Sequence, residues 1–171
     1  MTQPIKVAVL MGSDSDLDRL KPCLDTLKAF GVPFEARVLS AHRTPAQLIR
    51  FVEEAPAKNT GVFICAAGGA AHLAGVVAGH TTLPVIGIPM DNAPLGGLDA
   101  LLATVQMPGG VPVATFAVGG GGPQNAALFA VRILALADPD LAEKMVQQRA
   151  AMATQVLEKD KRLQQKLQAN S

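Results

Sequence analysis

Five short apolar runs in the first 138 residues predict strands. Residues 5–10 are almost continuously apolar, as expected of a strand that is covered on both faces of a parallel sheet. Further runs at 62–66, 84–88 and 111–118 predict strands of the same kind. Residues 34–39 instead alternate apolar with polar side chains, which favours an edge strand with one face partly exposed to water.

Helical patterns separate these runs. Leucines at helical spacing predict a helix from residue 17 that ends at Gly31, and Pro22 predicts a kink or an irregular first turn in it. Further helices are predicted at 45–55, between His72 and Gly79, at 97–105 and at 124–136.

The alternation of strand and helix predicts an α/β domain with right-handed crossovers, in the form of a three-layer flavodoxin-like sandwich around a parallel five-stranded sheet. Because the second strand is the most polar, we place it at an edge, which gives the strand order 2-1-3-4-5. In such sheets ligands bind beyond the carboxyl ends of the strands, where the order reverses between strands 1 and 3. The turns after strands 1, 2 and 3 are therefore the candidate site.

A charge-rich tail follows Asp138 and predicts one long exposed helix. We therefore divide the chain into a flavodoxin-like catalytic domain of residues 1–138 and a C-terminal helical extension of residues 139–171 that serves oligomerisation. Apolar side chains recur in the extension at alternating steps of seven and four, at Met145, Met152, Val156, Leu163 and Leu167. This narrow apolar seam suits packing on a helix of another copy or on the chain's own domain.

Composition narrows the function classes. The 171 residues include 15 basic and 14 acidic side chains and carry a net charge of +1, which argues against a nucleic-acid partner. Between residues 59 and 131 the only charged side chains are Asp91 and Asp99, but glycines, prolines and His72 interrupt every apolar stretch before the ~20 residues of a membrane span. The first residues lack an export signal, so we expect a cytoplasmic protein without a membrane partner.

The turn after strand 2 is the first candidate for chemistry, with the sequence Ser-Ala-His-Arg-Thr-Pro at 40–45. Thr44 to Gln47 matches a capping box with proline at the first helical position, so a helix should begin after Thr44. His42 and Arg43 would then lie where free backbone N–H groups and the helix dipole favour a phosphate. The alternative is a well-capped helix that two exposed polar residues precede.

The turn after strand 1, at residues 11–16, could hold a phosphate through backbone N–H groups and through Ser13 or Ser15, while Asp16 accepts from ribose hydroxyls. It lacks the glycines and the lysine of the common nucleotide-binding loops. A calcium loop is excluded because arginine and aspartate stand where glycine and glutamate are needed. The alternative is an acidic helix N-terminus without a ligand.

Histidines offer the remaining chemistry. His42 is the strongest candidate for acid–base catalysis, whereas His72 follows a glycine-rich turn and could face the crevice or be a hydrogen-bonded core side chain. Cys23 and Cys65 lack metal-binding spacing and are interpreted as reduced core thiols, so we expect no metal site. These residues favour acid–base chemistry on a small phosphorylated molecule.

Four segments together resemble the bacterial N5-carboxyaminoimidazole ribonucleotide mutase family of purine biosynthesis, namely residues 11–16, 40–45, 68–73 and 105–112. The resemblance extends over residues 5–138 and implies a homo-octamer that needs no cofactor. It implies an isomerase that moves a carboxylate from the exocyclic nitrogen of an imidazole ribonucleotide monophosphate to a ring carbon, which gives 4-carboxy-5-aminoimidazole ribonucleotide. A related branch carboxylates aminoimidazole ribonucleotide directly with carbon dioxide, but its loops differ from those of this sequence.

Position by position, the resemblance implies roles for individual residues. His42 would move the protons. Ser13, Asp16 and Arg43 would bind the ribose phosphate, and the pocket would be lined by Ser40, Ala41, Gly68, Ala70, His72 and Leu73. Two departures from the family pattern, at Ala74 and at residues 65–67, exchange one small residue for another and predict shifted packing rather than lost activity.

A non-enzymatic flavodoxin-like nucleotide-binding module is the rival from another class. A flavin carrier usually stacks its ring on aromatic side chains, and this sequence has no Trp or Tyr. A phosphoacceptor receiver would need an aspartate at the end of strand 3, where residues 66–69 are Ala, Ala, Gly and Gly. The sequence therefore favours the mutase.

Overall fold

The five predicted strands form one parallel sheet in the order β2-β1-β3-β4-β5, which confirms the predicted order. The structure is a computed structural model that describes residues 5–92 and 94–169. Its strands are β1 (Lys6–Met11), β2 (Phe34–Val38), β3 (Thr60–Ala67), β4 (Val85–Pro89) and β5 (Ala114–Thr115).

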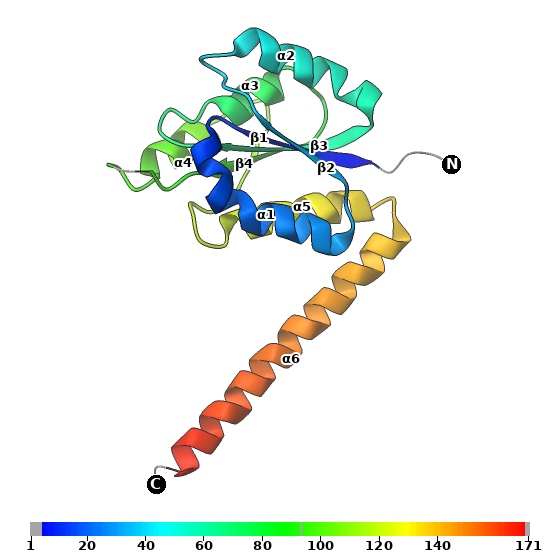
Figure 1. Cartoon of the computed structure of the whole chain (residues 1–171), viewed down its shortest axis with the longest axis vertical. Helices are drawn as coiled ribbons and strands as arrows, with labels where there is room; N and C mark the ends of the chain where they lie inside the picture. The colour runs from blue at the N-terminus through cyan, green and yellow to red at the C-terminus, as the bar shows by residue number, and fades with distance from the viewer. Residues whose placement is uncertain (1–4, 93, 170–171) are drawn as a thin grey trace. The chain divides into compact units, whose positions relative to one another are not determined.

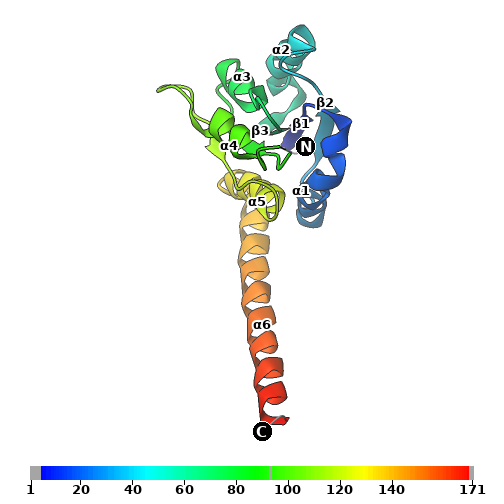
Figure 2. The ribbon, with the colours of Figure 1, turned by 90° about the vertical axis from the view of Figure 1, so that its left-hand side faces the viewer.

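Helices cover both faces of this sheet. Figures 1 and 2 show α2 and α3 over one face and α1 and α5 over the other, which confirms the predicted three layers. The helices are α1 (Leu17–Phe30), α2 (Pro45–Glu54), α3 (Leu73–Gly79), α4 (Leu98–Val105), α5 (Gly122–Ala135) and α6 (Pro139–Ala169), with short 3-10 helices η1 (Asp14–Asp16) and η2 (Pro56–Lys58). The helix α4 lies on the α3 side, because a Cβ on Gly87 of β4 would meet both Thr104 of α4 and Ala74 of α3.

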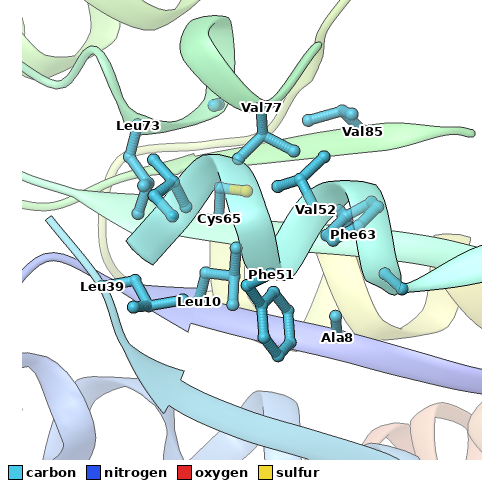
Figure 3. Packing of buried hydrophobic residues seen from close by; sticks show 13 residues of the cluster. Ala8, Leu10, Leu39, Phe51, Val52, Phe63, Cys65, Leu73, Val77 and Val85 are labelled. Atoms are coloured by element: carbon cyan, nitrogen blue, oxygen red, sulfur yellow. The ribbon is translucent and has the colours of Figure 1, made fainter. Parts of the chain in front are cut away.

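One half of the core lies between the central strands and the helices α2 and α3. Figure 3 shows Phe51 and Val52 of α2 packed with Leu10 of β1 and Phe63 of β3. Leu10 and Phe63 are fully buried, and burial of such a side chain stabilises the fold by about 1.5–3 kcal/mol. Because these strands are covered on both faces, their sequences are continuously apolar.

The two departures from the family pattern lie in this same cluster. Cys65 and Ala74 are each 2% exposed and pack beside Leu73. Cys23 is buried as well, both thiols are free, and burial raises the pKa of Cys23 to about 12 and the pKa of Cys65 still further. Both cysteines are therefore neutral core thiols at neutral pH.

The edge position of β2 is also confirmed. All five of its side chains are exposed or half-buried, and Lys6 of β1 donates to Glu35 over 2.9 Å. This hydrogen bond holds the pKa of Glu35 below its usual range.

Two local predictions need correction. The strand predicted at 111–118 is shortened to Ala114 and Thr115, the two residues that pair with β4 in the described part of the chain. Pro22 lies inside α1, and the irregular turn is η1, which comes before the helix. The predicted end of α1 at Gly31 is confirmed, since Gly31 takes a left-handed conformation with φ of 73°.

The predicted C-terminal helix is present as α6. Asp138 caps its start, because Asp138 Oδ1 accepts from the backbone N–H groups of Asp140 and Leu141, each over 3.1 Å. The chain's contacts divide it into the units Met1–Leu134 and Ala135–Ser171, and α6 makes up most of the second. Within the described ranges, no helix has both the length and the apolar character that crossing a membrane requires.

Candidate active site

The turns after β1, β2 and β3 and the loop after β4 enclose a cavity of about 380 Å³ at the carboxyl edge of the sheet. This is the place that the strand order predicts for a ligand. The cavity is lined by Gly12, Ser13, Ser15, Asp16, Ser40, Ala41, His42, Arg43, Ala67, Gly68, Ala70, Leu73 and Asn92.

All the predicted site residues except His72 line this cavity, and His72 contacts His42 directly. Sequence reasoning missed three lining residues: Gly12, Ala67 and Asn92. Asn92 could have been found, because it follows β4, whose carboxyl end lies at the same edge as those of β1 and β3.

The turn that carries His42 is closed by Ser40 and Thr44. Thr44 Oγ1 accepts from the Ser40 N–H over 2.9 Å and donates to the Ser40 carbonyl over 3.2 Å. Ser40 Oγ in turn accepts from the N–H groups of His42 and Arg43, over 3.3 and 3.1 Å. These bonds fix the backbone on which His42 and Arg43 are carried.

The predicted capping box is therefore wrong, although α2 does begin at Pro45. The Thr44 side chain makes no cap hydrogen bond to the helix because its hydroxyl is turned back to Ser40. The backbone N–H groups of His42 and Arg43 are occupied by Ser40 Oγ rather than free for a phosphate. An anion in this part of the cavity would depend on the guanidinium of Arg43 instead.

Arg43 also joins the first two turns. Its Nη2 donates to the Gly12 carbonyl over 3.0 Å, which brings the guanidinium next to the turn after β1. In that turn Ser13 Oγ accepts from the backbone N–H of Ser15 over 3.3 Å and from its hydroxyl over 2.8 Å. One cation and two hydroxyl groups therefore meet on one wall of the cavity.

Asp16 places a carboxyl group on the same wall. The residue is only 4% exposed, and this burial raises the pKa of Asp16 while the nearby charge of Arg19 lowers it. A carboxylate with so little water around it favours hydrogen-bond donors from a ligand, and ribose hydroxyls are such donors.

The two histidines of the site form a pair. Nε2 of His42 lies 2.9 Å from Nδ1 of His72, and the rings meet edge to face with centroids 5.0 Å apart. Both side chains are exposed, so His72 is not the core histidine that the sequence left open. Because one nitrogen donates and the other accepts, the tautomers of the two rings are coupled.

Among the described residues, no three His, Cys, Asp or Glu side chains converge as a metal site would require. The end of β3 is Ala67, so the position of a receiver's acidic residue is occupied by alanine and glycine.

Comparison with known proteins identifies the family of this chain. The model of the family described as AIR carboxylase matches residues 6–155. The N5-carboxyaminoimidazole ribonucleotide mutase of Saccharolobus solfataricus is 52% identical over 140 residues, which cover 82% of this chain and 87% of the relative. The mutase of the same name from Bacillus subtilis is 47% identical over 161 residues, which cover 94% of this chain and 99% of the relative.

Solved structures agree with this assignment. The crystal structure of a substituted PurE2 from Treponema denticola matches 94% of this chain and 99% of its own, with a TM-score of 0.86 and 29% identity. The structure of Treponema denticola PurE matches the same shares with a TM-score of 0.84 and 30% identity. The chain therefore belongs to the AIR carboxylase family.

Proposed function

We propose that this chain is an N5-carboxyaminoimidazole ribonucleotide mutase, an isomerase of purine biosynthesis that produces 4-carboxy-5-aminoimidazole ribonucleotide by acid–base catalysis and without a cofactor. Relatives that are 47–52% identical to this chain over most of their length carry this name. The single observation that carries the mechanism is the contact between His42 and His72 beside a cavity that also holds Arg43, Ser13 and Asp16.

The substrate's ribose phosphate would occupy the wall formed by the first two turns. Arg43 supplies a cation for the phosphate, the hydroxyl groups of Ser13 and Ser15 supply further donors, and Asp16 accepts from the ribose hydroxyls. This arrangement leaves the imidazole directed toward the histidines and toward the turn that carries Gly68 and Ala70.

The reaction breaks a C–N bond and forms a C–C bond. The exocyclic nitrogen gains a proton as the carbamate releases carbon dioxide, and the trapped carbon dioxide adds to the ring carbon. That carbon then loses its proton, so one group can give a proton in the first half and take it back in the second. His42 fills this role because imidazole can act as an acid and as a base near neutral pH.

His72 would assist by holding the ring of His42. A hydrogen bond between the two imidazoles orients the His42 ring and fixes which of its nitrogens carries a proton before the substrate arrives.

Direct carboxylation of aminoimidazole ribonucleotide is the second candidate, because the family model carries the description AIR carboxylase. Two assays distinguish the candidates. In the first, the purified chain is mixed with N5-carboxyaminoimidazole ribonucleotide in the presence of a chelator and without ATP, and formation of the 4-carboxy product is measured. In the second, aminoimidazole ribonucleotide and bicarbonate replace that substrate. Turnover in the first assay that greatly exceeds the second supports the mutase, and the reverse result supports the carboxylase.

The assembly and location belong to the same proposal. The exposed apolar seam of α6 supports a homo-oligomer, and the family resemblance supports an octamer. A ribonucleotide monophosphate is the expected small-molecule partner, without nucleic acid or membrane, and the cytoplasm is the expected location.

A further inference from the structure

Arg19 of α1 makes an unusual contact with the loop that follows β4. Its Nε lies 3.1 Å from Asp91 Oδ1, and its Nη1 donates to Asn92 Oδ1 over 2.8 Å. A guanidinium group only donates hydrogen bonds, so the Asn92 atom that it contacts must be the carbonyl oxygen. The contact therefore determines which way the Asn92 amide faces.

The amide nitrogen of Asn92 consequently faces Gly68. Both residues line the cavity, and a Cβ on Gly68 would collide with Asn92 Nδ2. Within the part of the chain that the structure describes, Nδ2 donates no hydrogen bond to a protein acceptor. An oriented donor is thus held at the cavity wall, available to a ligand.

The ion pair with Asp91 matters for geometry more than for stability. Both side chains are 47% exposed, and an exposed pair of this kind contributes little to the free energy of folding. A guanidinium that is held at two atoms has a fixed plane, however, and this plane sets the direction of the bond to Asn92.

We propose that Arg19 is a positioning residue, and that it holds Asn92 so that Nδ2 donates to an oxygen atom of the bound substrate. The inference rests on the proposed function and extends it. The acceptor is an oxygen of the transferred carboxylate or one of the ribose phosphate portion, and both offer the same chemistry to an amide N–H.

The variant Asn92→Ala tests the donor. Calorimetry measures its affinity for 4-carboxy-5-aminoimidazole ribonucleotide and for aminoimidazole ribonucleotide, which lacks the carboxylate. Loss of one hydrogen bond should weaken binding of the carboxylated nucleotide about five- to tenfold. A loss for that nucleotide alone assigns the acceptor to the carboxylate, an equal loss for both assigns it to the ribose phosphate, and unchanged affinity for both overturns the proposal.

Two variants test whether Arg19 acts through Asn92. Arg19→Met should weaken binding as much as Asn92→Ala does, and the double variant should bind no more weakly than either single one, because coupled residues are not additive. Arg19→Lys keeps the positive charge near Asp16, but one ammonium group cannot reproduce the planar fork, so we expect the same loss. Additive losses, or wild-type affinity in Arg19→Lys, would overturn the positioning role.

Lys21→Met is the matched control. Lys21 lies on the same helix and its Nζ is 2.7 Å from Asp18 Oδ1, so the change removes a cation outside the cavity. Its affinity for both nucleotides should equal that of the wild type, and thermal unfolding of every variant checks that it is folded.

Binding and turnover measurements on the wild-type protein distinguish failure of this inference from failure of the proposed function. A wild-type protein that binds neither nucleotide removes both proposals. A wild-type protein that isomerises N5-carboxyaminoimidazole ribonucleotide, together with normal binding by Asn92→Ala, removes only the inference about Arg19 and Asn92.

Discussion

The two units of the chain differ in how far their apolar side chains are buried. In Met1–Leu134, the central strands bury theirs, and Leu10 and Phe63 are fully inaccessible. In α6, Val156 is 63% exposed and Leu163 is 52% exposed. The central strands of the first unit form a buried core, whereas α6 presents an apolar surface of the kind that mediates association, as α4 of the first unit also does with Leu98 and Leu102.

This difference suggests that catalysis and assembly can be altered separately. The proposed chemical groups lie on turns at the carboxyl edge of a sheet whose core does not depend on the seam of α6. Changes in the site should therefore leave the subunit number intact.

The largest expected effect comes from His42→Asn. Asparagine keeps a similar polar shape but cannot transfer protons, so turnover should fall at least ~100-fold while nucleotide binding and oligomer mass stay near those of the wild type. Steady-state kinetics, calorimetry and light scattering measure the three quantities. Retention of more than about a tenth of the turnover would reduce His42 to a binding residue and make His72 the next candidate.

Arg43→Ala should have the next largest effect. Loss of a hydrogen-bonded cation should weaken nucleotide binding by about 1.5–3 kcal/mol. Arg50→Ala is the matched control, because Arg50 is an exposed arginine of α2 outside the cavity lining. Equal affinities for the two variants in calorimetry would remove Arg43 from the site.

Introducing a charged side chain in the middle of the α6 seam tests whether the seam mediates oligomerisation. Val156→Glu should lower the mass of the oligomer in light scattering, because it puts a carboxylate into an apolar contact that association would bury. Lys161→Glu places the same side chain on the opposite face of the helix and should leave the mass unchanged. Deletion of the residues after Asp138 should have the same effect as Val156→Glu or also reduce solubility, and a full-length protein that is monomeric would end the proposal.

The smallest effect should come from Asp16→Asn. Burial raises the pKa of Asp16 in the folded state, so the folded state binds this proton more tightly than the unfolded state does. The contribution of Asp16 to stability therefore falls as the pH rises through its folded-state pKa, and asparagine avoids this cost. The unfolding midpoint of Asp16→Asn at neutral pH should therefore lie above that of the wild type, and thermal unfolding measures the difference.

The same variant separates stability from function. The gain in the unfolding midpoint of Asp16→Asn should disappear in acid, where Asp16 of the wild type is protonated in both states. The affinity of the variant for the nucleotide should be lower than that of the wild type. A midpoint that is lower than that of the wild type at neutral pH would show that the ionised carboxylate stabilises the fold.

The sequence by itself determined the layers and the place of the site. The apolar runs predict strands because a strand that is covered on both faces has no polar side, and the polar residues of β2 mark an edge. Once the strand order is known, the turns after β1, β2 and β3 must meet at one edge, which brings Ser13, His42 and Gly68 together before any contact is known.

Only the tertiary structure decided the details that depend on distant partners. The length of β5 is set by its pairing with β4, and the hydroxyl of Thr44 is turned away from the helix that its sequence would cap. The contacts of His42 with His72 and of Arg19 with Asn92 join residues that are 30 and 73 positions apart. Local sequence patterns indicate which side of each segment is exposed to solvent. Contacts between distant residues form only when the segments pack together, so no local pattern predicted them.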